Sequence, residues 1–465
     1  MNNWFEHILF HTRTRPETPA MVMEDRAITY GMLGFALEMC ARRLHQLGLP
    51  RDAPVALMLK NPIRDMTLSL ALFRLGLPSI SLVHGQPGLD GVRPSVVLGD
   101  QDAARFVVSG HRLIEVTDAW FGAPVEGTLP AGFAGATDVC RLSLTSGSTG
   151  APKLIGHHIA DIGQRVQSFQ YADWRSLLCM PGLGSSFGFT AACAALALAR
   201  TVCFAESPHQ ALRMADLFAI NAAVVSPEQL VALTRVARRT RAHLASLHTV
   251  WVGGGLVTRA LLEAAMMHLC RDVLCRYGAS ETGVIAEAHA QVLLDDPGLA
   301  GYVLPGVQVS VADAQGHPCT DGTAGHVRVR QGDAWIDLGD IGWQEPDGRL
   351  YVLGRAAEVD PSTVRAARTR AISPAHEVEH LLRLEWDTSD AAAVLMEPSG
   401  AAPQIWVGVV DGKEARAEAL ETIARMRGIA HPIRVFALQA IPRGVNGKVN
   451  RAQLKALLLA ETGKP

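Results

Sequence analysis

Stretches typical of buried strands alternate with amphipathic helical stretches along much of the chain. Residues 28–49 begin with a short strand-like run, after which apolar side chains recur every three or four residues, as they do on one face of a helix. The pattern repeats with a strand at 53–59, a helix at 64–77 and a strand at 79–83. This alternation predicts an α/β fold in which a mostly parallel sheet is covered by helices on both faces.

The alternation returns in the middle of the chain. Helices are expected at 211–219, 227–240 and 258–269, and strands at 222–225, 248–252 and 272–277. From residue 301 the sequence changes to short strand-like runs separated by Gly and Asp, which predicts a small β subdomain at about 300–355.

A polar stretch after Arg355 marks the expected end of this large domain. It precedes a helix at 374–382, a strand, and a last helix at 451–459. We therefore predict a large N-terminal domain, residues 1–355, and a small, mobile α+β C-terminal domain, residues 356–465, which has a typical domain size.

The composition excludes several classes of protein. Hydrophobic residues make up 48% of the 465-residue chain, charged residues 19%, and the net charge is -2, without a basic run that would favour a nucleic acid or a membrane surface. The start lacks the pattern of a signal peptide, and the most apolar stretch, 191–199, is much shorter than the roughly 20 residues of a spanning helix. Eight cysteines without a C-x-x-C pair predict buried thiols in a cytoplasmic protein rather than a zinc site or disulfides.

The sharpest local signal is TSGSTGAPK, residues 145–153, which follows the end of a strand. Its glycines let the backbone turn and approach a ligand closely, and successive N–H groups in such a turn form an anion-binding nest. Hydroxyl groups add donors and the lysine adds a positive charge. The segment predicts a phosphate-binding loop composed of Thr145, Ser146, Gly147, Ser148, Thr149, Gly150 and Lys153.

This loop differs from a Walker loop, in which Gly directly precedes the Lys and a helix begins there. Here Pro152 precedes Lys153 and disfavours helix at Ala151. Taken alone, the segment also fits a polar surface loop without a ligand.

Three later segments carry other groups that a nucleotide site needs. YGASETG, residues 277–283, offers an aromatic ring for adenine and a carboxylate for magnesium. DLGDIGWQEPDGRLYVLGR offers Asp340, which can accept from ribose hydroxyls, and the guanidinium of Arg355 beside it. IPRGVNGKVNR places Lys448 in a Gly-flanked turn. Each group alone also fits a solvated surface residue, so their joint presence carries the argument.

In this order the segments resemble the adenylate-forming superfamily, which includes acyl-CoA synthetases, the adenylation domains of nonribosomal peptide synthetases and luciferases. The superfamily pattern T-S-G-[ST]-T-G-x-P-K corresponds to residues 145–153. Its Y-G-x-T-E, T-G-D, G-R and late G-K correspond here to YGASE, LGD, LGR and NGK. The resemblance runs from residue 28 to Lys448 and implies an enzyme that uses ATP to convert a carboxylic acid to an acyl adenylate.

The resemblance also implies a role for each matching residue. The loop would hold the β- and γ-phosphates, Ser280 would contact the α-phosphate, and Glu281 would bind Mg²⁺. Asp340 and Arg355 would hold the ribose, and Lys448 would reach the α-phosphate and the substrate carboxylate. Tyr277 with Gly253, Gly254 and Gly255 would line the adenine slot, and Gly278 and Ala279 are further expected cofactor-binding residues.

The chemistry explains why this set contains cations and donors rather than a general base. The attacking carboxylate is already ionised at neutral pH, so the protein must supply alignment and positive charge around an anionic phosphate. The residues expected to act in catalysis are Lys153, Ser280, Glu281 and Lys448.

The expected acid pocket begins at MPGLGSSFGF, residues 180–189, and departs from its relatives. Acyl-CoA synthetases carry P-x-x-H-x-x-G there, whereas this chain has no His and Ser185 or Ser186 stands in its place. Amino-acid-activating domains carry Phe-Asp where this chain has Phe187-Gly188, so an α-amino group would lack its counter-ion. We expect a small aliphatic or aromatic acid, in a pocket formed by Ser185, Ser186, Phe187, Gly188, Gly253 and Ala279.

The expected hinge departs as well. The superfamily pattern G-R-x-D-D-x-[IV]-K-x-x-G becomes the longer GRAAEVDPSTVRAARTR, with Ala357 at the hinge acid and Thr369 in place of the Gly that lines the pantetheine tunnel. The acyl acceptor is therefore open between CoA and the phosphopantetheine arm of a separate carrier protein, and we favour the carrier. Three nearby arginines fit the phosphates of CoA or an acidic carrier, and equally a solvated basic loop: Arg365, Arg368 and Arg370.

Two alternatives remain at this point. The hinge departures leave open a member of the superfamily that only forms the adenylate or has no catalytic activity. Residues 184–188 also match G-x-S-x-G, the pattern of a serine hydrolase with Ser186 as its nucleophile.

Overall fold

A computed structural model of the chain describes residues 4–83, 89–107, 110–133, 135–146, 152–170, 173–241, 244–320, 322–356, 373–386, 390–397, 402–411, 417–443 and 448–462. Within these ranges, none of the helices combines the length and the apolar character that crossing a bilayer requires. The chain divides into two compact units, the first formed by residues 1–225 with 245–247 and the second by residues 226–244 with 248–465. The predicted boundary at residue 355 lies within the second unit and stays a prediction.

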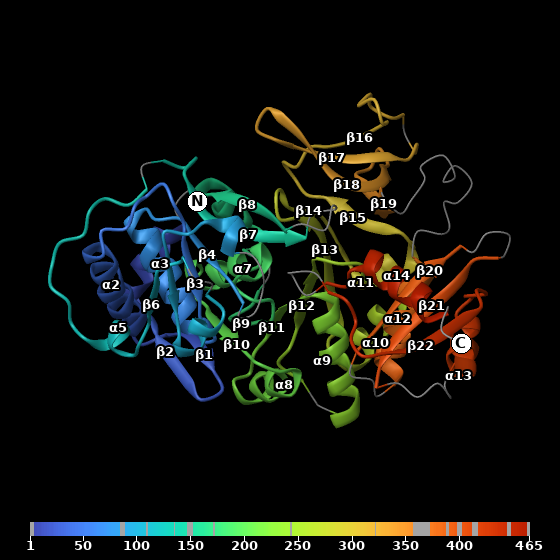
Figure 1. Ribbon diagram of the computed structural model, residues 1–465, viewed down its shortest axis with the longest axis horizontal. Coiled ribbons are helices and arrows are strands. Elements are labelled where there is room, and N and C mark those ends of the chain that lie inside the picture. Colours follow the sequence, from blue (N-terminus) through green and yellow to red (C-terminus); the bar gives the residue numbers. More distant parts are fainter. Residues whose placement is uncertain are drawn as a thin grey trace. The chain divides into compact units, whose positions relative to one another are not determined.

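The first unit holds two groups of strands (Figure 1). In one, the order is β11-β9-β10-β1-β2, and all neighbours are parallel except β1 and β2. In the other, the order is β6-β5-β3-β4-β7-β8, and only β7 and β8 are antiparallel. The strands are β1 (Pro19–Met23), β2 (Arg26–Thr29), β3 (Val55–Met58), β4 (Ser79–Ser81), β5 (Val96–Gly99), β6 (Leu113–Glu115), β7 (Val139–Ser146), β8 (Pro152–His158), β9 (Ser176–Cys179), β10 (Thr201–Phe204) and β11 (Ala222–Val225).

Helices pack against these strands because each helix has an apolar face that is buried against the apolar surface of the sheet. Leu44 and Leu72, from two neighbouring helices, pack with Val55 and Leu57 of β3 in one buried cluster. The helices of this unit are α1 (Trp4–Thr14), α2 (Tyr30–Gln46), α3 (Pro62–Leu75), α4 (Leu89–Val92), α5 (Ala119–Gly122), α6 (Ile159–Gln167), α7 (Ser186–Ala197) and α8 (Pro208–Leu217), with a 3₁₀ turn at Gln101–Arg105.

The second unit begins with parallel strands and continues as an antiparallel sheet. Strand β12 (Thr249–Gly253) lies parallel to β13 (Asp272–Ala279), and the remaining neighbours in the order β13-β14-β15-β19-β18-β17-β16 are antiparallel. These strands are β14 (Gly283–His289), β15 (Leu299–Val303), β16 (Val309–Ala312), β17 (Gly325–Gln331), β18 (Ala334–Gln344) and β19 (Arg349–Arg355). Helices α9 (Pro227–Thr240), α10 (Arg259–His268) and α11 (Ala290–Asp295) accompany them.

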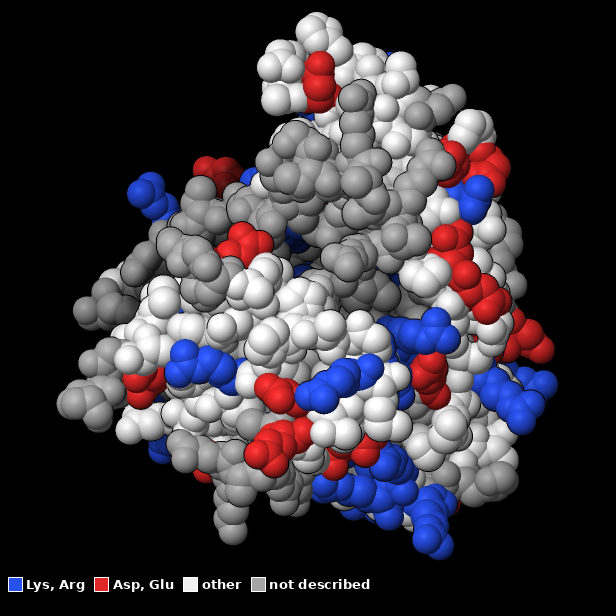
Figure 2. All heavy atoms as spheres, turned by 90° about the vertical axis from the view of Figure 1, so that its right-hand side faces the viewer, with Lys and Arg blue, Asp and Glu red and all other residues white. Residues whose placement is uncertain are grey.

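The C-terminal part of this unit is a three-stranded sheet of β20 (Asp390–Met396), β21 (Gln404–Val410) and β22 (Ile433–Leu438). Helices α12 (Pro374–Glu385) and α13 (Ala417–Met426) pack on one face, and α14 (Arg451–Thr462) packs on the other. On the face of the molecule shown in Figure 2, acidic and basic side chains lie interspersed over much of the described surface.

The predicted fold class is confirmed: the protein is α/β, with a large sheet-rich part, a small β subdomain and a small α+β C-terminal part. The prediction did not include α1, or the antiparallel pairing of β7 with β8, for which the sequence carries no periodic signal. All eight cysteines are free and seven are buried, in agreement with the buried thiols predicted from the absence of a C-x-x-C pair.

Candidate active site

The predicted adenine and ribose residues of the second unit lie beside the carboxyl ends of β12 and β13. The two strands run parallel, with Gly253 opposite Arg276, so Gly254 follows β12 at the level where Tyr277 continues β13. Ligands of α/β proteins bind where parallel strands end, because the loops that follow the strands meet there.

Two positions near this edge are occupied by glycine for different structural reasons. Gly254 has a φ of +90°, and nothing lies within 4 Å of the position a side chain would take, so a ligand can approach its backbone. A Cβ on Gly278 would lie 2.0 Å from the carbonyl oxygen of Gly283, at the irregularity between β13 and β14. Gly278 is therefore required by strand packing, whereas its expected role in cofactor binding remains a prediction.

Tyr277, Asp340 and Arg355 form a connected polar group. The Tyr277 hydroxyl donates to Asp340 Oδ2 at 2.7 Å, and Arg355 Nη1 lies 3.3 Å from Asp340 Oδ1. Asp340 and Arg355 are register partners on β18 and β19, which fixes them side by side. A carboxylate has about four acceptor positions, so Asp340 retains capacity for the hydroxyls of a ribose.

Lys448 belongs to the same group, although it follows the C-terminal sheet in sequence. Its side chain reaches solvent, yet the surrounding protein lowers its pKa by desolvation, with the charge of Arg355 acting in the same direction. Glu228 and Asp340 lie close enough to raise the same pKa in part. The structure therefore gathers Asp340, Arg355 and Lys448, which the sequence had assigned to one site.

The electrostatics of the group follow from burial. Asp340 is 9% exposed, and desolvation raises the pKa of its carboxyl, against the opposing effect of Arg355. Desolvation likewise raises the pKa of Tyr277 well above its ordinary value, with Asp340 adding to the effect, so the hydroxyl remains a donor. The group thus offers a carboxylate acceptor between two donors, close to an ammonium.

Helix α12 joins the C-terminal part to α9 and α10 through buried polar contacts. The backbone N–H of Ala260 donates to Glu377 at 2.9 Å, and Thr258 lies 2.9 Å from Nδ1 of His380. At the exposed end of α12, Arg238 and Glu385 form a two-point ion pair.

Ser280 and Glu281 occupy the turn between β13 and β14, and both are half-buried. Gln331 of β17 donates to the backbone oxygen of Glu281 at 3.2 Å, which ties the turn to the β subdomain. A single carboxylate at this place suits Mg²⁺, which is usually held by one or two carboxylates together with substrate phosphates and waters.

The predicted phosphate loop belongs to the first unit, where β7 and β8 flank it as a hairpin. Thr145 pairs with Lys153, and the Thr145 hydroxyl donates to the Lys153 carbonyl at 3.4 Å. A strand follows the loop rather than a helix, as expected for a loop that is not a Walker loop. Gly147, Ser148, Thr149 and Gly150, the side chain of Ser146 and the hinge residues Ala357, Arg365, Arg368, Thr369 and Arg370 lie outside the described residues.

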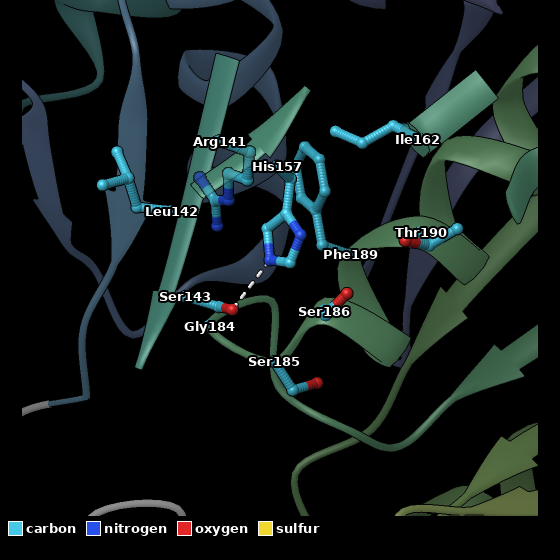
Figure 3. Close-up of a pocket in the computed structure, with 10 residues that line it drawn as sticks. All are labelled: Arg141, Leu142, Ser143, His157, Ile162, Gly184, Ser185, Ser186, Phe189 and Thr190. Atoms are coloured by element: carbon cyan, nitrogen blue, oxygen red, sulfur yellow. Dashed lines mark hydrogen bonds between the residues drawn. The ribbon is translucent and has the colours of Figure 1, made fainter. Parts of the chain in front are cut away.

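The predicted acid-pocket segment starts helix α7. Ser185 is its N-cap, since its hydroxyl accepts from the N–H of Gly188 at 3.0 Å. A Cβ on Gly188 would lie 2.4 Å from the Pro181 carbonyl oxygen, so the tight turn before α7 requires this glycine. Ser185 and Ser186 lie with Ser143 and His157 of the β7–β8 hairpin around a narrow hollow that has no room for a water molecule (Figure 3).

Hydrogen bonds connect the polar side chains around this hollow. Ser143 Oγ lies 2.8 Å from Nε2 of His157, and Arg165 Nη1 lies 3.2 Å from Nδ1 of the same ring. Arg165 also donates to Ser186 Oγ at 2.7 Å. Burial, with the charge of Arg165 beside it, lowers the pKa of His157 to about 3, so the ring is neutral.

Arg141 of β7 also lines this hollow and holds the surrounding residues together by several contacts. It donates to Ser79 Oγ at 2.9 Å and to the Leu183 carbonyl at 2.8 Å, and its guanidinium lies 4.2 Å from the centre of the Phe189 ring. It reaches the buried Asp65 through the shared hydroxyl of Ser81, which donates to Asp65 at 2.6 Å.

Sequence reasoning missed Arg141, Asp65, His157, Arg165 and Glu228. A signal existed for Arg141, since a charged residue within an otherwise buried strand needs an internal partner. No local pattern marks the other four.

The serine hydrolase alternative has no geometric support. Ser186 is the first residue of helix α7 and accepts a hydrogen bond from Arg165. The nearby His157 uses its two ring nitrogens on Ser143 and Arg165, so it does not serve as a base for Ser186.

Comparisons with known proteins identify similar ligases. The 2-succinylbenzoate–CoA ligase of Geobacillus kaustophilus is 25% identical over 98% of both chains. The fatty acid–[acyl-carrier-protein] ligase ScoC of Streptomyces coeruleorubidus is 24% identical over 96% of this chain and 94% of its own. The anthranilate CoA ligase AuaEII, solved with anthranoyl-AMP, shares the fold with a TM-score of 0.81 at 18% identity, over 98% of each chain.

The family described as AMP-binding enzyme matches residues 10–334, which is most of the chain. The match includes the β7–β8 hairpin, the end of β12 and the turn that carries Ser280 and Glu281. The protein therefore belongs to the family of AMP-binding enzymes.

Proposed function

We propose that this protein uses ATP to activate a small carboxylic acid as an acyl adenylate, with release of pyrophosphate, and then transfers the acyl group to a thiol. The observation that carries the proposal is the convergence of Tyr277, Asp340, Arg355 and Lys448, from three separate segments of the sequence, beside the ends of β12 and β13. An acceptor carboxylate, an aromatic ring and two cations at one place match the needs of a nucleotide.

The residues present suit ATP and Mg²⁺. Asp340 has free acceptor capacity for ribose hydroxyls, and Gly254 leaves its backbone open to a planar base. Glu281 would hold Mg²⁺, Ser280 would contact the α-phosphate, and the loop from Thr145 to Lys153 would bind the outgoing pyrophosphate. Bound Mg²⁺ supplies positive charge to the phosphate oxygens.

Lys448 would stabilise the reacting centre. The attacking carboxylate and the α-phosphate are both anionic, so an ammonium that contacts both lowers the barrier more than it strengthens ground-state binding. The charges of Glu228, Asp340 and Arg355 all act on Lys448, which supports a place for it beside the proposed nucleotide site.

Two acceptors fit the transfer step, namely CoA and the phosphopantetheine arm of a carrier protein. The relatives include ligases named for each acceptor. We favour a separate carrier protein because the sequence departs from the usual tunnel residues at Ala357 and Thr369.

The test is ATP–pyrophosphate exchange across a panel of carboxylic acids, followed by transfer assays with CoA and with phosphopantetheinylated carrier proteins. Exchange with at least one acid supports the activation step, and thioester formation with one acceptor identifies the second. Absence of exchange with all acids would refute the proposed activity, and exchange without transfer to either acceptor would indicate an enzyme that only forms the adenylate.

A further inference from the structure

We propose that Glu228 is a positioning residue for Lys448, and that its carboxylate holds the ammonium group beside the proposed nucleotide site. This inference rests on the proposed function, since Lys448 is the residue proposed to act at the reacting phosphate. Glu228 acts through Lys448 rather than on the substrates themselves.

The first turn of helix α9 borders the end of β12. Helix α9 begins at Pro227 and runs beside β12, as Figure 1 shows. A Cβ on Gly255, two residues after β12, would lie 3.2 Å from the ring of Pro227. Gly255 directly follows Gly254, whose backbone is open to a ligand. Glu228, the residue after Pro227, therefore lies close to the edge where the nucleotide is proposed to bind.

The side chain of Glu228 is oriented by Ser226, the N-cap of α9. The Ser226 hydroxyl accepts from the backbone N–H of Gln229 at 3.3 Å and donates its single proton to Glu228 Oε2 at 2.9 Å. A carboxylate has about four acceptor positions, so this hydrogen bond leaves capacity for an ammonium. Glu228 is half-buried, so water screens its charge only in part.

Among the charged groups that act on Lys448, Glu228 has the largest effect. Desolvation lowers the pKa of Lys448, and the charge of Glu228 opposes this lowering. Arg355 adds to the lowering, and Asp340 opposes it less than Glu228 does. Coulombic interactions weaken with distance, so the largest effect places the Glu228 carboxylate close to the ammonium. Asp340 already accepts from Tyr277 and lies 3.3 Å from Arg355, which leaves Glu228 as the main counter-charge of Lys448.

This arrangement matters for the reaction because a lysine side chain is flexible. Its four-carbon stem gives the ammonium many positions, and only some of them reach the α-phosphate. A carboxylate held on the first turn of α9 restricts the ammonium to the neighbourhood of the nucleotide before the substrates bind. Less ordering of the side chain is then required in the reaction itself.

The first experiment measures the charge state of Lys448 by competitive labelling of amines with acetic anhydride, read for each lysine by mass spectrometry. Lys455, an exposed lysine of α14, is the internal reference. Only the neutral amine reacts, and the loss of the Glu228 charge lowers the pKa of Lys448 further. In Glu228→Gln, labelling of Lys448 relative to Lys455 should therefore rise at least about threefold at about pH 8, and the increase should fade towards about pH 10.5 as the amine becomes neutral in both proteins.

Two results of this experiment would overturn the inference. Unchanged labelling of Lys448 at about pH 8 would show that Glu228 does not act on its charge. An equal increase at both pH values would show that the substitution only exposes the lysine. Gln can still accept from the Ser226 hydroxyl, so the start of α9 should be preserved in Glu228→Gln.

Two further variants separate charge from structure. Glu228→Asp keeps the carboxylate, one methylene further back, so its labelling of Lys448 should lie closer to the wild type than that of Glu228→Gln. Glu385→Gln removes an exposed carboxylate that pairs with Arg238 on the same helix, and it should change neither the labelling of Lys448 nor activity. The same increase in Glu385→Gln would assign the effect to looser packing of α9 against α12 and overturn the inference.

ATP–pyrophosphate exchange then tests the role of Glu228 in the reaction. With the acid that the wild type uses best, Glu228→Gln should lower kcat about tenfold while the KM for ATP changes less than about threefold. An unchanged kcat would overturn the positioning role. Labelling needs no substrate, so absence of exchange with every acid refutes the proposed function, while the labelling result still decides whether Glu228 holds Lys448.

Discussion

Tyr277 donates its hydroxyl proton to Asp340 at 2.7 Å, which joins the predicted adenine residue to the predicted ribose residue. The contact crosses from β13 to β18, so one hydrogen bond connects the two halves of the proposed nucleoside site. Because Asp340 is buried and its pKa is raised, the loss of a donor makes its ionised form still less favourable.

Tyr277→Phe is therefore expected to weaken ATP binding. The ring remains, while Asp340 loses one of its two described donors, so the KM for ATP in pyrophosphate exchange should rise about tenfold, as for the loss of a hydrogen bond to a charged group. Tyr302→Phe, at an exposed tyrosine of β15, is the matched control. An unchanged KM for ATP in Tyr277→Phe would contradict the placement of this pair in the nucleotide site.

Lys448→Ala should remove most adenylation while ATP binding persists. A well-placed donor at the reacting phosphate contributes roughly 2.7–4 kcal/mol of transition-state stabilisation, so kcat for exchange should fall about 10²–10³-fold. Lys455→Ala on α14 removes an exposed lysine from the same part of the chain and should leave kcat unchanged. Full activity in Lys448→Ala would rule out its catalytic role.

The rate of adenylation should decline in the alkaline range because Lys448 must be charged. Desolvation lowers its pKa below the ordinary 10.5, so the ammonium is lost at a lower pH than in a free lysine. Activity is therefore retained below the lowered pKa and falls as pH rises through it. In Lys448→Arg, whose guanidinium stays charged, any remaining activity should lack this decline. The same decline in both proteins would assign it to another group.

The fold could be predicted from the sequence wherever periodicity and turn residues coincide. The structure has α9 at Pro227–Thr240 and β11 at Ala222–Val225, as the sequence predicts, because Ser226 caps the helix and Pro227 begins it. The β7–β8 hairpin was not predicted, since its antiparallel pairing depends on contacts across an irregular loop rather than on a local pattern.

The residues of the candidate site likewise fall into those that the sequence identified and those that it did not. Tyr277, Asp340, Arg355 and Lys448 lie in short motifs, so their sequence order was sufficient to assign them to one site. Residues whose role depends on tertiary contacts could not be recognised from the sequence. The low pKa of His157, for example, depends on burial of its ring and on the charge of Arg165, which no local pattern in the sequence indicates.

His157 should make the protein sensitive to acid. Its folded pKa of about 3 lies below the ordinary 6.5, so between these values the unfolded chain binds more protons, and stability falls as pH decreases by up to about 1.4 kcal/mol per pH unit. His157→Gln should reduce this slope of the unfolding free energy between pH 6 and 4, whereas His209→Gln, at an exposed histidine, should preserve it. An unchanged slope in His157→Gln, measured by urea unfolding, would show that the residue is not buried in its neutral form.

The buried pair of Arg141 and Asp65 should couple in stability. Arg141 is 3% exposed and Asp65 is 4% exposed, and the guanidinium reaches the carboxylate through Ser81. Arg141→Met leaves a buried carboxylate without its cation and should cost about 3–5 kcal/mol of unfolding free energy. Adding Asp65→Asn removes that charge and should restore part of the loss, so the double variant unfolds at a higher urea concentration than Arg141→Met alone.

Arg105→Met is the control, because the Arg105 side chain is 78% exposed and its removal should change stability by less than about 0.5 kcal/mol. Additive losses in the double variant would show that the two charges act independently. A further consequence concerns the proposed acid pocket, since Arg141 also donates to the Leu183 carbonyl, two residues before Ser185. Arg141→Lys, which keeps the charge but has fewer donors, should therefore retain more stability than Arg141→Met while still raising the KM for the acid.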